Sequence, residues 1–198
     1  MANPEIIGLL CAGSSFFESG PRRSSGVVLS RSELAGYLAG TSDIAMSFAL
    51  GCYALDQDAE RLLIAYVRVW AAHLANREGW EIVKGRPTVS NLSAIAVYEV
   101  IRPLVHMACA GSGYTRDARS GKRVVCSACA GTGIKALSGR KIAAAAGLDK
   151  MDWFRHWQNR YLQILKYVIE LDGEVQAILA DATKPLDVET KKAYKTSY

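Results

Sequence analysis

The apolar residues of this chain recur mostly three or four positions apart, which is the spacing of helices that bury one face. A first helix is expected from Ser42 or Asp43 towards Leu55. Asp56 can cap the next helix, because a carboxylate accepts hydrogen bonds from the free N–H groups of a first turn. His73 is interpreted as a packed or surface residue of that helix. The apolar face of the helix is expected to contain Ala59, Leu62, Leu63, Tyr66, Trp70 and Leu74.

A third helix is expected to begin near Thr88 or Ser90, after a loop indicated by the glycines and the proline of residues 79–87. Pro103 lacks the N–H group that a helix interior needs, so it should kink this helix or end its regular hydrogen bonding. The apolar stripe of the helix is expected to contain Val97, Val100, Ile101, Leu104 and Val105.

The last third of the chain predicts a compact helix over residues 139–146, a turn at Gly147 and a long helix that Asp149 can cap. Gly173 is a candidate break in the long helix. The apolar stripe of this helix is interpreted as core packing and not as a base-stacking surface. The stripe consists of Trp153, Trp157, Tyr161, Ile164, Val168, Leu171, Val175 and Ile178.

One phrase occurs twice between the third helix and the compact helix. His106-Met-Ala-Cys109-Ala-Gly-Ser-Gly113 is followed by Cys126-Ser-Ala-Cys129-Ala-Gly-Thr-Gly133. Two ligand pairs, each separated by two residues, supply what a tetrahedral zinc ion needs from two tight turns. The glycines after each pair allow the backbone to bend around the thiolates. The sequence therefore predicts one structural Zn²⁺ per chain, held by His106, Cys109, Cys126 and Cys129.

Other interpretations of these cysteines stay open at this point. A buried cysteine can serve as a small apolar residue, and Cys-x-x-Cys can be a redox pair. If His106 is a surface residue, Cys11 or Cys52 could supply the fourth ligand. The five cysteines of the chain do not resemble a disulfide framework, so a reducing cytoplasm fits best. No basic region precedes the apolar residues 6–12, and no apolar run approaches the length of a membrane span.

Basic residues are concentrated around and after the repeated phrase. Residues 109–166 contain eleven Lys or Arg and three Asp, a net charge of +8, whereas the whole chain carries +5. A basic segment attached to a mildly acidic remainder is typical of a surface that binds a polyanion. Solvated helix faces without a ligand would be the simpler explanation. The residues expected to contact double-stranded DNA are Arg116, Arg119, Lys122, Arg123, Arg140, Lys141, Lys150, Arg155 and Arg160.

The two helices around Gly147 resemble a helix-turn-helix. Ala143 is small where two helices must approach closely, and Gly147 can adopt the left-handed conformation of the turn. Lys150, Arg155 and Arg160 would lie on or near the outward side of the second helix, where a recognition helix contacts DNA. An ordinary helical hairpin is the alternative. Apolar residues for a shared core are Ile142, Leu148 and Trp153.

These features predict a mainly α fold: a helical body with an inserted zinc knuckle, formed as a short β-hairpin or loop, and a helix-turn-helix-like pair. The expected segments are a flexible N-terminal segment (1–40), a helical body (41–105), the zinc-binding knuckle (106–134), the helix pair with a long C-terminal helix that packs on the body (135–182), and a flexible tail (183–198).

From about Thr41 to Ala180 the chain resembles the Q antitermination proteins of lambda-like bacteriophages. That family has paired C-x-x-C-x-G-x-G units, and here the first unit starts with His106 in place of Cys. The phrase alone also resembles the zinc region of DnaJ-type chaperones, which have more such repeats and a J-domain. The resemblance to Q proteins implies binding to a DNA element at a late phage promoter in the cytoplasm of the bacterial host. It also implies engagement of RNA polymerase paused with its sigma factor, and read-through of terminators.

The same residues suggest two other classes of function. The first is a zinc-containing helix-turn-helix regulator that binds DNA and never travels with polymerase. The second is a zinc-dependent hydrolase or deaminase, which needs an open metal position and a nearby general base. Because four protein ligands are supplied and no Glu follows His106 in an H-x-E arrangement, an enzyme with a small-molecule substrate is not expected.

Overall fold

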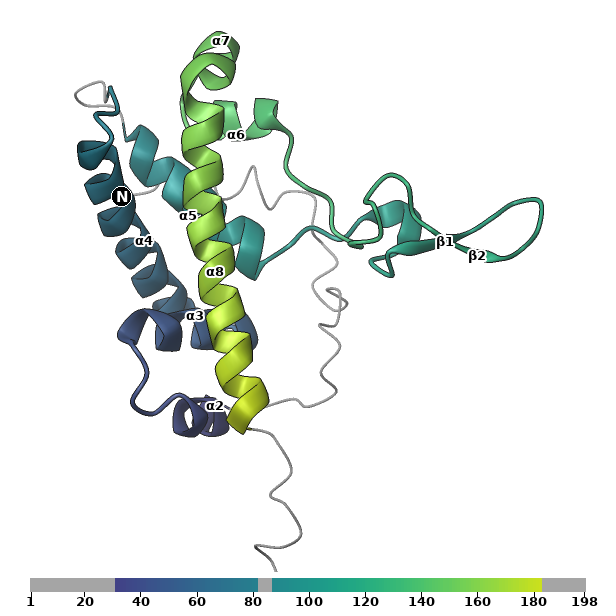
Figure 1. The fold of residues 1–198 in the computed structure, drawn as a ribbon, viewed down its shortest axis with the longest axis horizontal. Helices are drawn as coiled ribbons and strands as arrows, with labels where there is room; N and C mark the ends of the chain where they lie inside the picture. The colour runs from purple at the N-terminus through teal and green to yellow at the C-terminus, as the bar shows by residue number, and fades with distance from the viewer. Residues whose placement is uncertain (1–30, 82–86, 183–198) are drawn as a thin grey trace, which may run out of the picture.

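The computed structural model describes residues 31–81 and 87–182, and the structural statements below concern these residues. A bundle of helices forms the body, and a two-stranded hairpin projects from it (Figure 1). The mainly helical fold with a short β-hairpin is therefore confirmed. In chain order the elements are α2 (Arg31–Tyr37), α3 (Asp43–Tyr53), α4 (Gln57–Arg77), α5 (Thr88–Ile101), a 3-10 turn (Met107–Cys109), β1 (Tyr114–Arg116), β2 (Arg123–Val125), α6 (Gly139–Ala145), α7 (Lys150–Asp152), a π-helical turn (Trp153–Trp157) and α8 (Gln158–Ala182).

Side-chain caps begin the helices at the predicted positions. The Ser42 hydroxyl accepts a hydrogen bond from the N–H of Ala45 at 3.3 Å and caps α3. The Asp56 carboxylate accepts from the N–H groups of Asp58 and Ala59, at 2.9 and 3.1 Å, and caps α4. Each cap satisfies donors that the first helical turn would leave unpaired.

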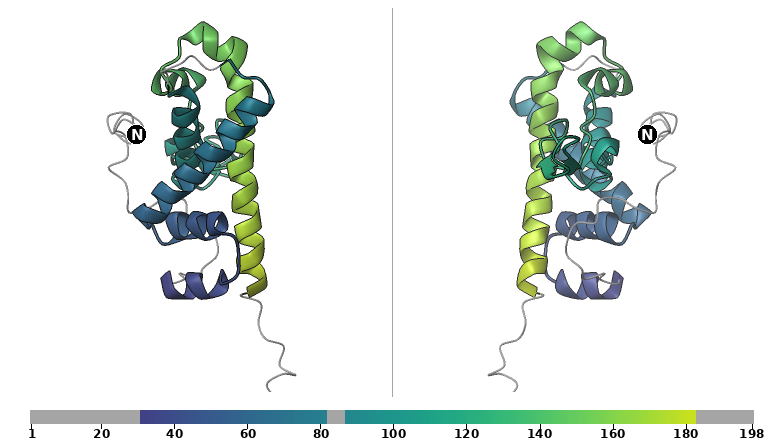
Figure 2. Two further views of the ribbon diagram at one scale, coloured as in Figure 1. Left: turned by 90° about the vertical axis from the view of Figure 1, so that its left-hand side faces the viewer. Right: turned by 90° about the vertical axis from the view of Figure 1, so that its right-hand side faces the viewer.

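Helix α8 runs along the whole body and packs on α3, α4 and α5 (Figures 1 and 2). Its predicted stripe is buried from Trp153 to Val175, so these aromatic and aliphatic side chains belong to the core. Gly173 does not break the helix, which continues to Ala182. The expected break was wrong because burial of the residues on either side stabilises a continuous helix more than one glycine weakens it.

The body begins earlier in the chain than expected. Helix α2 lies inside the segment that was expected to be flexible, and its Leu34, together with Leu38, is fully buried against the core. The boundary at residue 41 was therefore wrong for residues 31–40. The remainder of that segment, residues 1–30, and the expected tail over 183–198 lie outside the described residues.

The buried face of α4 agrees with the predicted one at Ala59, Leu63 and Leu74 and differs from it at two positions. Leu62 is 55% exposed and Tyr66 is 38% exposed, whereas Val67 and Ala71 are fully buried. The helix has apolar residues on its outer side as well, so periodicity alone also assigned Leu62 and Tyr66 to the buried face. His73 is exposed, in agreement with its interpretation as a surface residue.

The base of the projecting segment is fixed by two glutamates of the body. Glu60 of α4, only 6% exposed, forms an ion pair with Arg102 immediately after α5. Glu99 of α5 accepts hydrogen bonds from the Tyr161 hydroxyl and, at 3.2 Å, from the N–H of Leu137. The chain therefore leaves the body and returns to it at anchored positions. Burial and the Glu99 carboxylate raise the pKa of the Tyr161 hydroxyl far above its usual value, so it remains a donor.

Arg102→Ala is expected to lower the free energy of unfolding by about 3 kcal/mol, because it leaves the Glu60 carboxylate buried without its partner. Arg61→Ala is the matched control. Its ion pair with Asp58 lies on the surface, with both side chains more than 70% exposed, and should contribute less than about 1 kcal/mol. Urea unfolding of both variants tests this. If both variants lost the same free energy of unfolding, the buried ion pair would contribute no more to stability than the exposed one.

Within the described residues, none of the helices combines the length and the apolar character needed to cross a membrane.

Candidate metal centre

The repeated phrase folds into two halves with the same backbone pattern. The N–H of His106 donates to the carbonyl of Gly133 at 2.9 Å, and the N–H of Cys126 donates to the carbonyl of Gly113 at the same distance. Each half therefore begins by pairing with the end of the other. The antiparallel bridge Val105–Ile134 has its counterpart in the ladder pair Tyr114–Val125. This twofold arrangement follows from the sequence repeat.

Each half closes in a tight left-handed turn. Ala110 and Ala130 both have positive φ, at 47° and 49°. The Ser112 hydroxyl donates to the carbonyl of Cys109, and the Thr132 hydroxyl donates to that of Cys129, both at 2.7 Å. The repeated Ser or Thr of the phrase thus holds the cysteine turn in each half.

The four predicted ligands lie together at the centre of these turns. One ligand atom from each of His106, Cys109, Cys126 and Cys129 lies within 4.8 Å of all the others. The Nδ1 atom of His106 lies 3.4 Å from the Sγ atom of Cys109 and 3.5 Å from that of Cys126. The Sγ atoms of Cys109 and Cys129 are 3.8 Å apart. This group could bind one metal ion.

These separations fit a tetrahedral ion with one nitrogen and three sulfur ligands. Zinc bonds of about 2.3 Å to sulfur and about 2.0 Å to nitrogen place two sulfurs about 3.8 Å apart, and a sulfur and a nitrogen about 3.6 Å apart. The observed distances agree with both values. The donor set, a histidine and three cysteines, is also one that structural zinc sites use.

His106 occupies the position in the first half that Cys126 occupies in the second. Both residues precede a Cys by three positions, and both N–H groups bond to the final glycine of the other half. The alternative ligand Cys52 is half-buried in α3 and does not belong to the ligand group. The other alternative, Cys11, lies outside the described residues. The arrangement therefore brings His106 into the ligand set.

Backbone amides point at the thiols. Burial raises the pKa of the Cys109 thiol, and hydrogen bonding from the N–H of Gly113 works in the opposite direction. Burial also acts to raise the pKa of Cys129. There the N–H of Gly133, 3.3 Å from the sulfur, and the neighbouring thiols outweigh it, so this pKa lies below its usual value. Amide donors of this kind stabilise thiolates, which are the form that binds metals.

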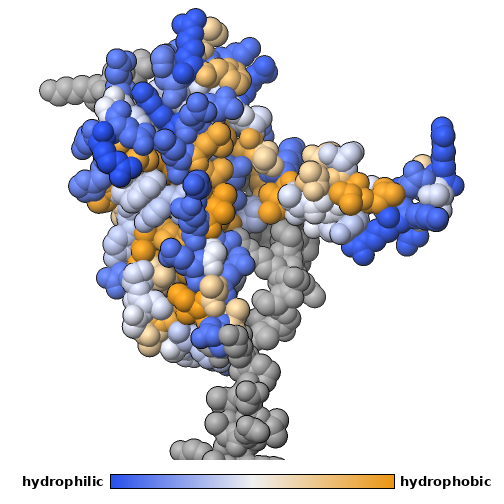
Figure 3. Space-filling view, in the orientation of Figure 1, coloured by the Kyte–Doolittle hydropathy of each residue, from blue (hydrophilic) through white to orange (hydrophobic). Residues whose placement is uncertain are grey.

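The hairpin β1–β2 extends from the metal centre into solvent. Hydrophilic residues gather at its far end, and hydrophobic ones, including Val124 and Val125, lie along its stem (Figure 3). Arg116 lies directly opposite Arg123 in the ladder, and the Arg123 guanidinium lies 3.9 Å from the centre of the Tyr114 ring. Tyr114 was not predicted as a site residue, and its position beside Arg123 follows only from the strand register.

The acidic residue of the hairpin, Asp117, is hydrogen-bonded within the hairpin turn. The Asp117 carboxylate accepts hydrogen bonds from the N–H groups of Arg119 and Ser120 and from the Ser120 hydroxyl. The Ser120 hydrogen bonds, ahead of that from Arg119, hold the pKa of Asp117 below its usual value. Among the described residues no ion pair joins a hairpin cation to a carboxylate. The exposed cations of the hairpin are Arg116, Arg119, Lys122 and Arg123.

The predicted pair of helices around Gly147 is present as α6 and as the helix that begins with α7. Gly147 has φ of +72°, and the Asp149 carboxylate accepts from the N–H groups of Met151 and Asp152 at 2.7 and 2.9 Å. Ile142, Ala143, Ala146 and Trp153 are buried and belong to the main core. The exposed basic residues of this pair are Arg140, Lys141, Lys150 and Arg155. They lie at the α6–α7 end of the body, apart from the hairpin (Figure 1).

Arg160 packs against two aromatic rings. Its guanidinium lies 4.8 Å from the centre of the Trp157 ring and 5.5 Å from that of Trp80. A cation held over aromatic rings stabilises the packing beneath it. Arg160 therefore stabilises the packing of α8 against Trp80, and its contact with DNA stays a prediction.

No protein-family model and no curated protein sequence matches this chain. The function must therefore be argued from the metal centre and the charged surfaces around it.

Proposed function

We propose that the protein is a zinc-containing, DNA-binding transcription antitermination factor of the kind that the Q proteins represent. The observation that carries the proposal is a basic hairpin, projecting from a closed four-ligand centre, whose cations form no ion pair with a carboxylate of the described residues. A closed centre fixes the shape of a loop and leaves no position for a substrate, so its role is structural and not catalytic.

The ion proposed for the centre is zinc. His106, Cys109, Cys126 and Cys129 would hold it, and it would supply a rigid cross-link between the two halves of the repeat. Zinc binds sulfur and nitrogen ligands in tetrahedral geometry, so three thiolates and an imidazole suit it. Magnesium and calcium prefer oxygen ligands.

The charge arrangement of the hairpin supports a polyanionic ligand. Like charges placed directly opposite each other destabilise an antiparallel pair, and in the part of the chain that the structure describes no ion pair to a carboxylate offsets this cost for Arg116 and Arg123. A DNA phosphate would relieve it, because guanidinium groups bind phosphate oxygens strongly. The exposed basic residues at the start of α6 and α7 form a second surface with the same preference. Both surfaces have the positive charge that binding of double-stranded DNA requires.

The step after DNA binding is engagement of the bacterial RNA polymerase paused with its sigma factor, in the cytoplasm of the host. The factor would then travel with the enzyme and make it read through pauses and terminators. This step rests on the order of the elements: helical body, repeated knuckle, basic hairpin, helix pair.

In vitro transcription through a terminator, with purified polymerase and the full chain, tests the proposal. Read-through that depends on a promoter-proximal DNA element supports it. DNA binding without read-through would assign the protein to the helix-turn-helix regulators that do not travel with polymerase. Absence of both activities would overturn the DNA-binding role.

The double variant Arg116→Ala/Arg123→Ala is expected to weaken DNA binding and to make its salt dependence less steep. Each phosphate contact contributes about −0.9 to the slope of log K against log salt, so loss of two contacts should change the slope by about 1.8. Fluorescence anisotropy at several salt concentrations measures this.

The matched control is Arg61→Ala/Lys166→Ala, which removes two exposed cations paired with acids on α4 and α8. It should leave the slope unchanged. If both double variants change the slope equally, the hairpin has no particular contact with DNA.

A further inference from the structure

The outer face of α4 is an unusual surface for a helix at the edge of a bundle. From Leu62 to Asn76 its exposed positions carry no charged residue. Leu62 is 55% exposed and Val69 is 59% exposed. Arg68, the cation within this stretch, is half-buried, and its Nε atom donates to the carbonyl of Ser90 at 3.4 Å. A helix that is apolar on both faces is normally covered on both.

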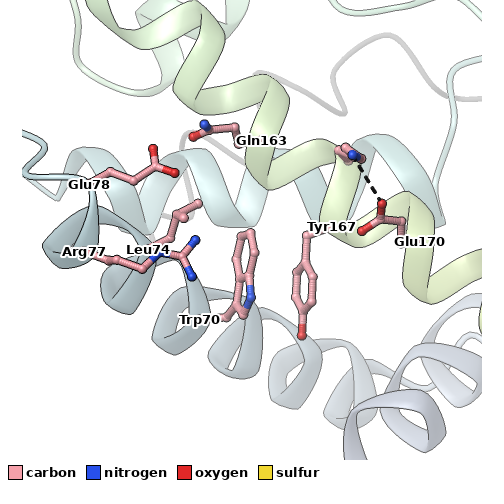
Figure 4. Close-up of a pocket in the computed structure, with 8 residues that line it drawn as sticks. Trp70, Leu74, Arg77, Glu78, Gln163, Tyr167 and Glu170 are labelled. Carbon is pink, nitrogen blue, oxygen red and sulfur yellow. Dashed lines mark ion pairs between the residues drawn. The ribbon is translucent and has the colours of Figure 1, made fainter.

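No described element covers this face. In the left view of Figure 2, α4 crosses the front of the body with its outer side towards the viewer. Its flank towards α8 is occupied: the Trp70 ring stacks on Tyr167, with ring centres 3.9 Å apart and planes at 4° (Figure 4). Arg77 and Glu78 border this flank near the helix end. The stack belongs to the bundle, so the uncovered surface is the outer face alone.

The residues along the centre of this face follow the spacing of a coiled-coil seam. Successive positions differ by four, three, four, three and four residues, which is the heptad pattern of helices that pair along their length. We define these residues as the α4 seam: Asp58, Leu62, Ala65, Val69, Ala72 and Asn76. All of them are exposed.

The α4 seam is self-complementary when two copies run antiparallel about an axis level with residue 67. Leu62 then faces Ala72 of the second copy, and Val69 faces Ala65 of the second copy. A large side chain meets a small one at every apolar layer, which is how facing positions interdigitate.

The ends of the α4 seam also match in this orientation. Asp58 faces Asn76 of the second copy, whose amide can donate to a carboxylate. Arg77 of the second copy follows directly, so an acid and a base meet at each end. In a parallel pair Asp58 would face Asp58 of the second copy, and like charges at close range disfavour it.

We propose that the protein forms a homodimer through antiparallel pairing of the α4 seam with that of a second copy. The proposal does not rest on the proposed function, because it uses no residue of the metal centre, the hairpin or the helix pair. The seam lies on the opposite side of α4 from its core-facing residue Val67, so pairing requires no rearrangement of the body.

Val69→Glu tests the interface in the full chain by sedimentation equilibrium. Each dimer would bury two unpaired carboxylates, so the dissociation constant should rise about 100-fold. Ile169→Glu is the matched control, since Ile169 on α8 is 53% exposed and lies outside the seam. It should leave the dissociation constant unchanged. Thermal unfolding and metal content confirm that both variants fold.

Cross-linking of single-cysteine additions tests orientation. Ala65→Cys and Val69→Cys chains, mixed, should cross-link beyond the wild-type background, because position 65 faces position 69 of the second copy. Either variant alone should not. Cross-linking of each variant by itself would indicate a parallel pair and overturn the proposed register. A wild-type chain that stays monomeric at high concentration would overturn the dimer itself, without bearing on DNA binding.

Discussion

Removal of the metal is expected to unfold residues 106–134 while the helical body remains folded. The three cysteines of the centre form a small buried cluster of their own, separate from the main core. The exposed hairpin contributes no further buried side chains, so little besides the metal holds the two halves together. Structural zinc contributes about 10–16 kcal/mol in small finger peptides at neutral pH. The body keeps the core formed by α3, α4, α5 and α8.

Amide hydrogen exchange before and after chelation measures this directly. Protection should disappear over residues 106–134 and persist in α4, α5 and α8. Cys109→Ser should give the same pattern without a chelator and should abolish binding of one zinc per chain. Cys52→Ser is the control, because Cys52 lies outside the ligand group and should leave the stoichiometry at one. A knuckle that stays protected without metal would contradict the structural role of the ion.

The ligand set could be predicted from the sequence because two short phrases repeat at a fixed offset. Each copy of the phrase forms the same local turn around its two ligands. The two turns then need only one mutual orientation to bring all four ligands together. The caps at Asp56 and Asp149 were predictable for a similar reason, since each depends on residues two or three positions away. These are local effects, which sequence patterns report well.

Contacts between distant segments could not be predicted in the same way. Helix α2 is a short segment in a polar context, and the burial of its Leu34 depends on a core built by later helices. Arg160 was expected to contact DNA, but its position over Trp80 depends on where α4 ends in space. Leu62 and Tyr66 were wrongly assigned to the buried face of α4, because the outer side of this helix also carries apolar residues.

That mistake is informative about the surface. Periodicity identifies a buried face when the opposite face is polar. On α4 the opposite face is uncharged for four turns. The apolar spacing of the core-facing residues therefore overlaps with that of the α4 seam. A sequence that obscures which side of a helix is buried is what a helix with two packing partners would produce.

Gly113→Ala is expected to weaken zinc binding by about a thousandfold. A Cβ atom on Gly113 would lie 2.0 Å from the carbonyl oxygen of Gly131, and one on Gly133 would lie 2.1 Å from that of Gly111. The two halves approach each other so closely that only glycine fits at either position. The left-handed backbone, with φ of +73° at Gly113, costs about 1–2 kcal/mol for alanine, and the overlap adds about 1–3 kcal/mol.

Gly121→Ala separates these two causes. Gly121 at the tip of the hairpin has φ of +65° and has no atom within 4 Å of the position that a Cβ would take. The variant should therefore show the conformational strain without the collision, and zinc affinity should fall by less than about thirtyfold. Competition against a chromophoric chelator gives both constants. Equal losses would mean that backbone strain alone controls the site. A loss confined to Gly113→Ala would show that the close approach of the two halves is what forms the metal centre.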